Sequence, residues 1–171
     1  MVRDIWVDAD SLPKDLRPIV IKLAVRLEVP LYFVADRSLP DVSGFIAQDT
    51  GRIRAESGDR TLKSNVKMVV VQSGENSADD YIVDGAQEGS LCITHDIPLA
   101  SRLLEKNCTV LDDRGGSYTK ENIKALLADR SVNAELRSWG VFAEQQSRHT
   151  KTGIKNFADN LDRTVTKMKG M

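Results

Sequence analysis

The sequence is poor in cysteine. Cys92 and Cys108 are the only cysteines among 171 residues, and their spacing matches no metal-site motif. Cys92 lies within an apolar run and Cys108 precedes another. We therefore interpret both as small buried hydrophobic residues in a reducing compartment. Nothing in the sequence requires a disulfide.

Long hydrophobic runs and a large net charge are also missing. No apolar run approaches the about 20 residues that span a membrane, and Asp4 and Asp8 interrupt the apolar stretch that an N-terminal signal region would need. The formal net charge is −1, so any contact with nucleic acid needs a local basic patch. We expect a cytoplasmic protein without a membrane partner.

The residues that are present indicate an ordinary globular domain. Of the 171 residues, 41% are hydrophobic and 29% are charged, which suits a soluble domain with a hydrophobic core. Apolar runs typical of buried strands occupy 5–8, 31–35, 66–71, 91–94 and 109–111. Helix signals follow these runs along the chain. We predict a three-layer α/β/α fold with a mainly parallel sheet of four to five strands.

The C-terminal part is predicted to lie outside the main domain, which we place at residues 1–145. A short helix over 134–139 and a polar linker over 145–152 lead to a tail helix over 153–168. One face of the tail helix is apolar, and the other carries lysine and arginine side chains. The apolar face would dock on the domain or on a second subunit in a homodimer. The basic face would alternatively contact nucleic acid.

Residues 36–65 give the weakest structural signal. Polar residues, glycine and proline punctuate them, and only 45–47 suggests a short helix. The ordinary interpretation is a solvated loop whose acids offset its bases. The alternative is a flap that contacts phosphates through Arg and Lys. The basic side chains that would make these contacts are Arg52, Arg54, Arg60 and Lys63, with Arg114 elsewhere in the chain.

The stretch from Ile5 to Ser11 carries the first functional signal. It is an apolar run that ends in two acids, Asp8 and Asp10. In an extended segment residues two apart share a face, so both carboxylates should project the same way. They would then lie at the carboxyl end of a strand, where ligands bind in α/β proteins. The ordinary alternative is that Asp10 or Ser11 only caps the next helix.

Two further acids occupy corresponding places. Asp79 begins the helix after the strand at 66–71, and Asp96 directly follows the strand at 91–94. Because the carboxyl ends of parallel strands share one edge of a sheet, we expect these acids to meet the first pair there. Asp80 has an ordinary structural explanation, since Ser77 and Asp80 resemble a capping box.

Clustered carboxylates point to a bound cation, because without one they repel each other and raise each other's pKa values. Mg²⁺ or Mn²⁺ prefers oxygen ligands and can promote attack on a phosphodiester. The predicted ligands and catalytic residues are Asp8, Asp10, Asp79 and Asp96. Ser11, Asp80, Thr94 and His95 are the predicted supporting residues. Thr94 would orient a carboxylate or water, and His95 would contact substrate or form an exposed turn.

Four motifs carry a resemblance to a known family. They are Trp6-Val7-Asp8-Ala9-Asp10 through Pro13, Ala78-Asp79-Asp80 with Ile82-Val83, Ile93 through Ala100, and Arg114-Gly115 with Tyr118-Thr119. Together they resemble the YaiI/YqxD family of bacterial proteins of unassigned function. That family often reads Asp-Ala-Cys-Pro where this chain has Ser11-Leu12-Pro13, so the resemblance requires no cysteine chemistry here.

The YaiI/YqxD family is similar to PIN-like nucleases, and this implies a site. In such nucleases acids follow the first strand, open a mid-chain helix and follow a later strand as T-x-D. The resemblance implies that Asp8, Asp79 and Asp96 match these acids, and that RNA is the substrate. Asp49 and Glu56 are the candidates for an acid that PIN nucleases carry on a second helix.

Two other functions fit the same residues. The run from Val7 to Leu12 also resembles the opening motif of haloacid-dehalogenase-type phosphatases, whose first Asp is a nucleophile and whose second is an acid/base. Asp8 would then be the nucleophile, and Ser73 or Thr94 would match the second motif. The third interpretation is a non-catalytic RNA-binding or regulatory module that keeps the fold and a structural ion.

Overall fold

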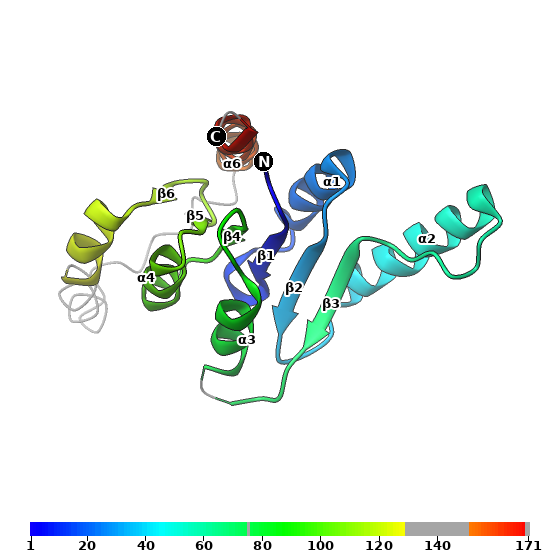
Figure 1. The fold of residues 1–171 in the computed structure, drawn as a ribbon, viewed down its shortest axis with the longest axis horizontal. Coiled ribbons are helices and arrows are strands. Elements are labelled where there is room, and N and C mark those ends of the chain that lie inside the picture. The colour runs from blue at the N-terminus through cyan, green and yellow to red at the C-terminus, as the bar shows by residue number, and fades with distance from the viewer. Residues whose placement is uncertain (75, 129–150, 170–171) are drawn as a thin grey trace.

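The computed structural model describes residues 1–74, 76–128 and 151–169. Strands and helices alternate along most of the chain (Figure 1). The strands are β1 (Ile5–Asp8), β2 (Leu31–Ala35), β3 (Val66–Val70), β4 (Leu91–Ile93), β5 (Thr109–Leu111) and β6 (Ser117–Tyr118). The helices are α1 (Arg17–Leu27), α2 (Pro40–Ser57), α3 (Ser77–Gly85), α4 (Ile97–Glu105) and α6 (Lys151–Lys169), with a 3-10 turn η1 (Ala9–Ser11) after β1. A further helix covers 120–128.

The sheet has six strands in the order β3-β2-β1-β4-β5-β6. The first five are parallel, and β6 alone is antiparallel to β5. The predicted mainly parallel sheet is therefore confirmed. The sixth strand was not predicted, because its two residues are too short to show any periodicity in the sequence.

Side chains that alternate along the strands feed two cores, one on each face of the sheet. Ile5 and Val7 of β1 face the larger core, which α1, α2 and α6 cover. Trp6, between them, faces the smaller core under α3, α4 and the helix at 120–128. Helices therefore lie on both faces, and the predicted three-layer α/β/α arrangement is confirmed. Cys92 and Cys108 are buried free thiols in the smaller core, as interpreted from the sequence.

The prediction of a loop over 36–65 is wrong, because most of this segment forms the 18-residue helix α2. Pro40 occupies the first turn, and Gly58 ends the helix in the left-handed conformation at φ 71°. Only Val42 and Asp49 of α2 are buried. A helix with so few buried positions shows little apolar periodicity, which explains why the sequence pattern did not indicate it.

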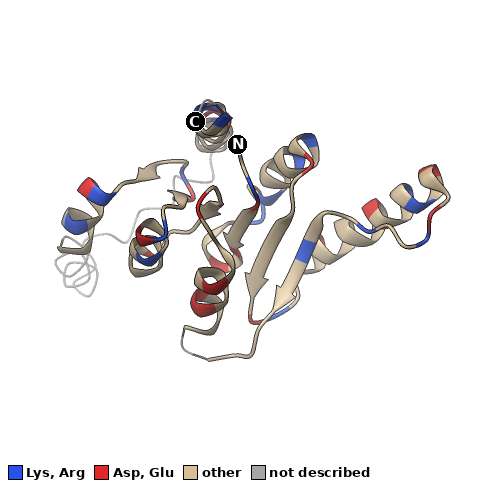
Figure 2. Ribbon diagram, viewed as in Figure 1, with Lys and Arg blue, Asp and Glu red and all other residues tan. Residues whose placement is uncertain are grey.

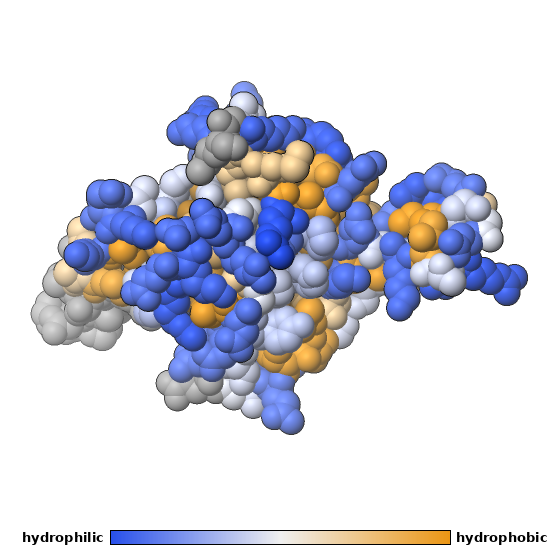
Figure 3. Space-filling model, viewed as in Figure 1, coloured by the Kyte–Doolittle hydropathy of each residue, from blue (hydrophilic) through white to orange (hydrophobic). Residues whose placement is uncertain are grey.

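The far end of α2 projects from the sheet beside the edge strand β3 (Figure 1). In the space-filling view it forms a separate lobe with mixed hydrophilic and hydrophobic surface (Figure 3). Arg52 is paired with Asp49 at 2.7 Å and with Glu56 at 3.0 Å. Arg54 donates its Nε–H to the Leu62 carbonyl at 2.9 Å. These bases are therefore engaged locally in the helix and in the turn that follows it.

The C-terminal helix α6 packs on the domain. Phe157, Leu161, Val165 and Met168 are buried in the larger core. The N-terminal ammonium group also donates to the Met168 carbonyl at 2.6 Å, so the two ends of the described chain lie together (Figure 1). The apolar face predicted for the tail helix thus contacts its own chain. The helix predicted at 134–139 and most of the predicted linker lie outside the described residues.

No helix within the described ranges is both long and apolar enough to cross a membrane.

Candidate functional site

A pocket of about 850 Å³ lies at the carboxyl edge of the parallel sheet. Each of the five parallel strands contributes a lining residue at or shortly after its end: Asp8, Asp36, Val71, Asp96 and Asp112. The direction of strand addition reverses between β1 and β4, since β2 and β3 lie on one side and β5 on the other. Open α/β sheets bind their ligands at such a switch point.

The pocket is strongly acidic. Seven aspartates line it, namely Asp8, Asp10, Asp36, Asp79, Asp96, Asp112 and Asp113. Arg114 is the one lysine or arginine among the described lining residues, and His95 lies at the same opening. Figure 2 shows further acidic residues along the adjoining helix α3. The structure therefore brings acids from separate strands together at one edge of the sheet, where the sequence led us to expect them.

Asp8 is a buried carboxylate of the pocket. It ends β1, and its side chain is only 7% exposed. Ser11 Oγ donates to Asp8 Oδ2 at 2.8 Å, and Thr94 Oγ1 donates to the same oxygen at 3.0 Å. Burial raises the pKa of Asp8, and the hydrogen bonds from Ser11 and Thr94 oppose this rise. The two hydroxyls hold the carboxylate in one orientation.

The strand register explains why Thr94 reaches Asp8. Val7 of β1 pairs with Ile93 of β4, so the next residues, Asp8 and Thr94, lie side by side. The Thr94 hydroxyl also accepts the backbone N–H of Asp96 at 3.0 Å. One buried hydroxyl therefore links the two carboxylate-bearing segments across the switch point. This agrees with the predicted orienting role of Thr94, which lies beneath the pocket and does not line it.

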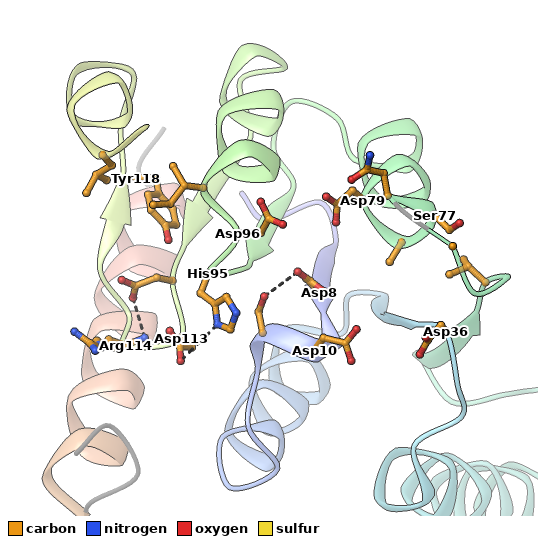
Figure 4. Close-up of a pocket in the computed structure, with 18 of the residues that line it drawn as sticks. Asp8, Asp10, Asp36, Ser77, Asp79, His95, Asp96, Asp113, Arg114 and Tyr118 are labelled. Atoms are coloured by element: carbon orange, nitrogen blue, oxygen red, sulfur yellow. Dashed lines mark hydrogen bonds and ion pairs between the residues drawn. The ribbon is translucent and has the colours of Figure 1, made fainter. Parts of the chain in front are cut away.

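Asp96 both caps the helix α4 and lines the pocket. It is the N-cap of α4, where its Oδ1 accepts the Leu99 N–H at 3.2 Å. It also lines the pocket, and Figure 4 shows its carboxylate facing the same space as those of Asp8 and Asp79. The ordinary capping interpretation and the site interpretation are therefore compatible for this residue.

Asp79 carries the clearest electrostatic signal. Its pKa is raised from 3.8 to about 6, first by partial burial and then by the negative charges of Asp96 and Asp8. The neighbouring Asp80 points elsewhere and pairs with Arg102 at 3.0 Å. The capping box predicted from Ser77 and Asp80 is wrong, because Asn76 is the N-cap of α3 and makes no side-chain cap hydrogen bond.

Asp10 does not share an extended segment with Asp8, which corrects the alternation predicted from the sequence. The chain turns into η1 directly after β1, so Asp10 lies in a 3-10 turn. Its side chain is 56% exposed and lies 3.7 Å from an Arg37 nitrogen. Asp10 still lines the pocket, and Figure 4 shows it between Asp8 and Asp36.

The loop between β5 and β6 forms the far wall of the pocket. Asp112 Oδ1 accepts the N–H groups of Arg114 and Gly116, both at 2.8 Å. Burial raises the pKa of Asp112, and these two hydrogen bonds counteract it. His95 Nδ1 lies 4.0 Å from the buried carboxylate of Asp113. His95 is about half exposed, so it combines the predicted turn position with access to a ligand.

Several predicted residues are not brought to the pocket. Asp80 lies outside it, and so does the predicted nucleic-acid group on and after α2. That group consists of Arg52, Arg54, Arg60 and Lys63; of the predicted basic contacts, Arg114 alone lines the pocket. The candidates for a second-helix acid, Asp49 and Glu56, also lie elsewhere. Asp49 is buried against Ser64, whose Oγ donates to it at 2.7 Å.

Three lining acids were missed in the sequence. Asp36 directly follows β2, and Asp112 and Asp113 directly follow β5. The signal was the same one that identified Asp96, an acid immediately after a predicted strand.

The donor set suits a hard cation that keeps its water. The seven aspartates of the pocket offer carboxylate oxygens, which Mg²⁺ and Mn²⁺ prefer as ligands. Among the described residues, no three His, Cys, Asp or Glu side chains are arranged to hold one ion by themselves. Mg²⁺ usually binds one or two carboxylates and completes its shell with water and substrate phosphate. The pocket fits that mode and does not fit an all-protein cage.

Comparison with known proteins gives one consistent family. A family model described as "Uncharacterized BCR, YaiI/YqxD family" matches residues 52–167. A UPF0178 protein of Citrifermentans bemidjiense is 37% identical, and the match covers 96% of this chain and 94% of the relative. A UPF0178 protein of Treponema denticola is 36% identical over 95% and 92%. One of Pseudomonas aeruginosa is 34% identical over 96% and 91%. No solved structure matches the chain.

Proposed function

The chain belongs to the YaiI/YqxD family, and from its acidic pocket we propose that it is a metal-dependent, PIN-like nuclease that cleaves RNA phosphodiesters. The observation that carries the proposal is the meeting of Asp8, Asp79 and Asp96, from three separate segments, at the switch point of the sheet. The raised pKa of Asp79 supports it, because a cation would relieve the repulsion that contributes to the rise.

One or two of Asp8, Asp79 and Asp96 would bind the ion directly, and water and substrate phosphate would complete its shell. A bound Mg²⁺ or Mn²⁺ would offset their charge and polarise a phosphoryl oxygen of the substrate. Ser11 and Thr94 keep Asp8 in place through their hydrogen bonds to Oδ2. Such preorganised side chains reduce the reorganisation that a reaction requires.

The rim residues have separate roles in the proposal. Arg114 lines the pocket and would bind a substrate phosphate, since its guanidinium suits phosphate geometry. His95 lies next to Asp113 at the same opening and would contact the substrate from that side. Asp10 and Asp36 extend the acidic surface toward α2 and would bind a second ion or an outer water shell.

The test is cleavage of a labelled single-stranded RNA with Mn²⁺, with Mg²⁺ and with EDTA. We expect cleavage by the wild type that needs the divalent ion, and none by Asp96→Asn. Asparagine can still accept the Leu99 N–H, so this variant keeps the α4 cap and should fold. Asp84→Asn is the matched control, because Asp84 is exposed on α3 and does not line the pocket. Activity that persists in Asp96→Asn contradicts the proposed site.

The buried state of Asp8 makes the phosphatase interpretation less suitable. A carboxylate nucleophile must reach its substrate, whereas Asp8 is 7% exposed and accepts two hydroxyl hydrogen bonds on one oxygen. A beryllofluoride adduct on Asp8 would nevertheless favour the phosphatase. RNA binding without turnover, unchanged in Asp96→Asn, would favour the non-catalytic module.

A further inference from the structure

A second pocket, of about 390 Å³, lies on the other side of the β5–β6 loop. Gly115 and Gly116 of the loop and Ser117 of β6 form one wall, and Asn160, Arg163 and Lys167 of α6 form the opposite wall. None of its described lining residues is an aspartate or a glutamate. The molecule thus has an acidic and a basic pocket that share one loop.

The glycine at the centre of the loop allows α6 to approach. Gly115 has φ +85°, and a Cβ built on it would lie 2.6 Å from the Asn160 Cβ. Asn160 Nδ2 donates to the Arg114 carbonyl at 3.5 Å, so helix and loop are in contact at this point. Asn160 Oδ1 also accepts the Arg163 Nη1–H at 3.2 Å, which orients the guanidinium beside the loop. The close approach builds the pocket.

The pocket has the chemistry of a phosphate site. Arg163 and Lys167 are four residues apart on α6, so their side chains emerge on the same side of the helix. Neither forms an ion pair within the described part of the chain. Ser117 and Thr109 add hydroxyl groups to the lining, whereas the Thr164 hydroxyl already donates to the Asn160 carbonyl at 2.8 Å. Cationic side chains with nearby hydroxyls are the groups that proteins use most for phosphate oxygens.

The two pockets adjoin along the chain. Arg114 lines the acidic pocket and Gly115, the next residue, lines the basic one. Figure 4 shows α6 passing beside the loop that carries Asp113 and Arg114. We propose that the basic pocket binds a backbone phosphate of the same single-stranded RNA whose scissile phosphodiester lies in the acidic pocket. That the ligand is an RNA strand rests on the proposed nuclease function. That the basic pocket binds a phosphate does not.

The basic pocket would offset the electrostatic repulsion between the acidic pocket and RNA. A pocket lined by seven aspartates repels a polyanion, and the chain has a net charge of −1. Cations beside the acidic pocket would attract the RNA strand and hold it in position without neutralising the carboxylates of that pocket. Arg114, Arg163 and Lys167 would then be the cationic side chains along the path of the strand.

The experiment measures binding apart from cleavage. Fluorescence anisotropy follows a 5′-labelled single-stranded RNA in EDTA, over a series of salt concentrations. The test variant is Arg163→Gln with Lys167→Gln, and the matched control is Lys151→Gln with Lys155→Gln. All four side chains are exposed on α6, and both double variants lose the same charge, but the control residues do not line the basic pocket.

We expect the test variant to bind RNA at least about tenfold more weakly than the control variant, since a charged hydrogen bond contributes a factor of about ten. The slope of log affinity against log salt should fall by about 0.7 relative to the control variant, because the pocket binds one phosphate and each phosphate contact on a single strand contributes about 0.7. Equal losses in both variants, or no RNA binding by the wild type, would overturn the proposal.

A measurement with inorganic phosphate distinguishes two possible ligands of the basic pocket, an RNA strand and a free anion. If phosphate raises the Tm of the wild type and not of the Arg163→Gln/Lys167→Gln variant, while RNA binding is the same in both, the pocket binds a free anion and the RNA assignment is overturned. The proposed function fails separately. If Asp96→Asn cleaves RNA like the wild type, the nuclease site is wrong, yet the difference between the two double variants in EDTA would still support the basic pocket.

Discussion

Replacing Asp79 with asparagine removes one charge from the acidic pocket and measures the electrostatic strain there. The pKa of Asp79 rises from its ordinary 3.8 to about 6 because of burial, Asp96 and Asp8. A rise of this size corresponds to about 3 kcal/mol. Because the side chain is half-exposed, solvent screening reduces the effect to about 1–2 kcal/mol. Asp79→Asn should therefore increase the free energy of unfolding of the metal-free protein by about 1–2 kcal/mol at pH 7.5.

The sign follows from proton binding. With a raised pKa, folded Asp79 binds a proton more readily than unfolded Asp79. The wild type therefore loses stability as the pH rises from about 4 to about 6, and the full loss persists above that range. The asparagine side chain of the variant does not titrate. The variant should therefore gain over the wild type across this window and show little gain at its acidic end.

The assay is urea denaturation in EDTA, followed by circular dichroism between pH 4.5 and pH 7.5. Asp84→Asn is the control, because Asp84 is exposed on the same helix and lies outside the pocket. Added Mg²⁺ should stabilise the wild type more than the Asp79→Asn variant. A variant that is less stable than the wild type at pH 7.5, or a difference independent of pH, would refute the reasoning.

Three other substitutions test the packing around the site. Thr94→Val removes a buried hydrogen bond to Asp8 and should cost about 2 kcal/mol in urea denaturation; an unchanged midpoint would show that this bond contributes nothing. Gly85→Ala places a Cβ 2.2 Å from the Trp6 ring, so we expect a Tm decrease, at a cost of about 1–3 kcal/mol, and an altered near-ultraviolet dichroism. Phe157→Ala empties a fully buried position under α6 and should cost about 3–5 kcal/mol, independently of protein concentration. A concentration-dependent loss would instead indicate that α6 stabilises a dimer.

Local chemistry was sufficient to predict much of the architecture. The apolar runs at β1, β2, β4 and β5 are continuous because these strands are covered on both faces, so each is evident without its neighbours. The tail helix was visible from an apolar stripe that includes Phe157 and Leu161, both of which are buried. Asp96 could be expected at a helix start, because Pro98 follows it in the first turn.

The tertiary structure alone decided α2 and the turn of Asp10. α2 buries only two side chains, so no periodic pattern marks it, and its ends depend on Pro40 and Gly58. Asp10 leaves the strand direction because η1 follows β1 at once. Alternation along a strand predicts a shared face only while the strand continues, and the sequence does not mark where β1 stops.

The acidic pocket likewise depends partly on features visible in the sequence and partly on the tertiary structure. The acids that follow strands are visible one by one in the sequence, whereas the strand order determines which of them meet. β4 lies beside β1 although the two strands are over 80 residues apart, and this pairing puts Thr94 next to Asp8. The shared loop of the two pockets depends on α6 returning to Gly115 from the end of the chain. Such contacts are nonlocal, so no spacing of residues records them; packing of the two cores brings them together.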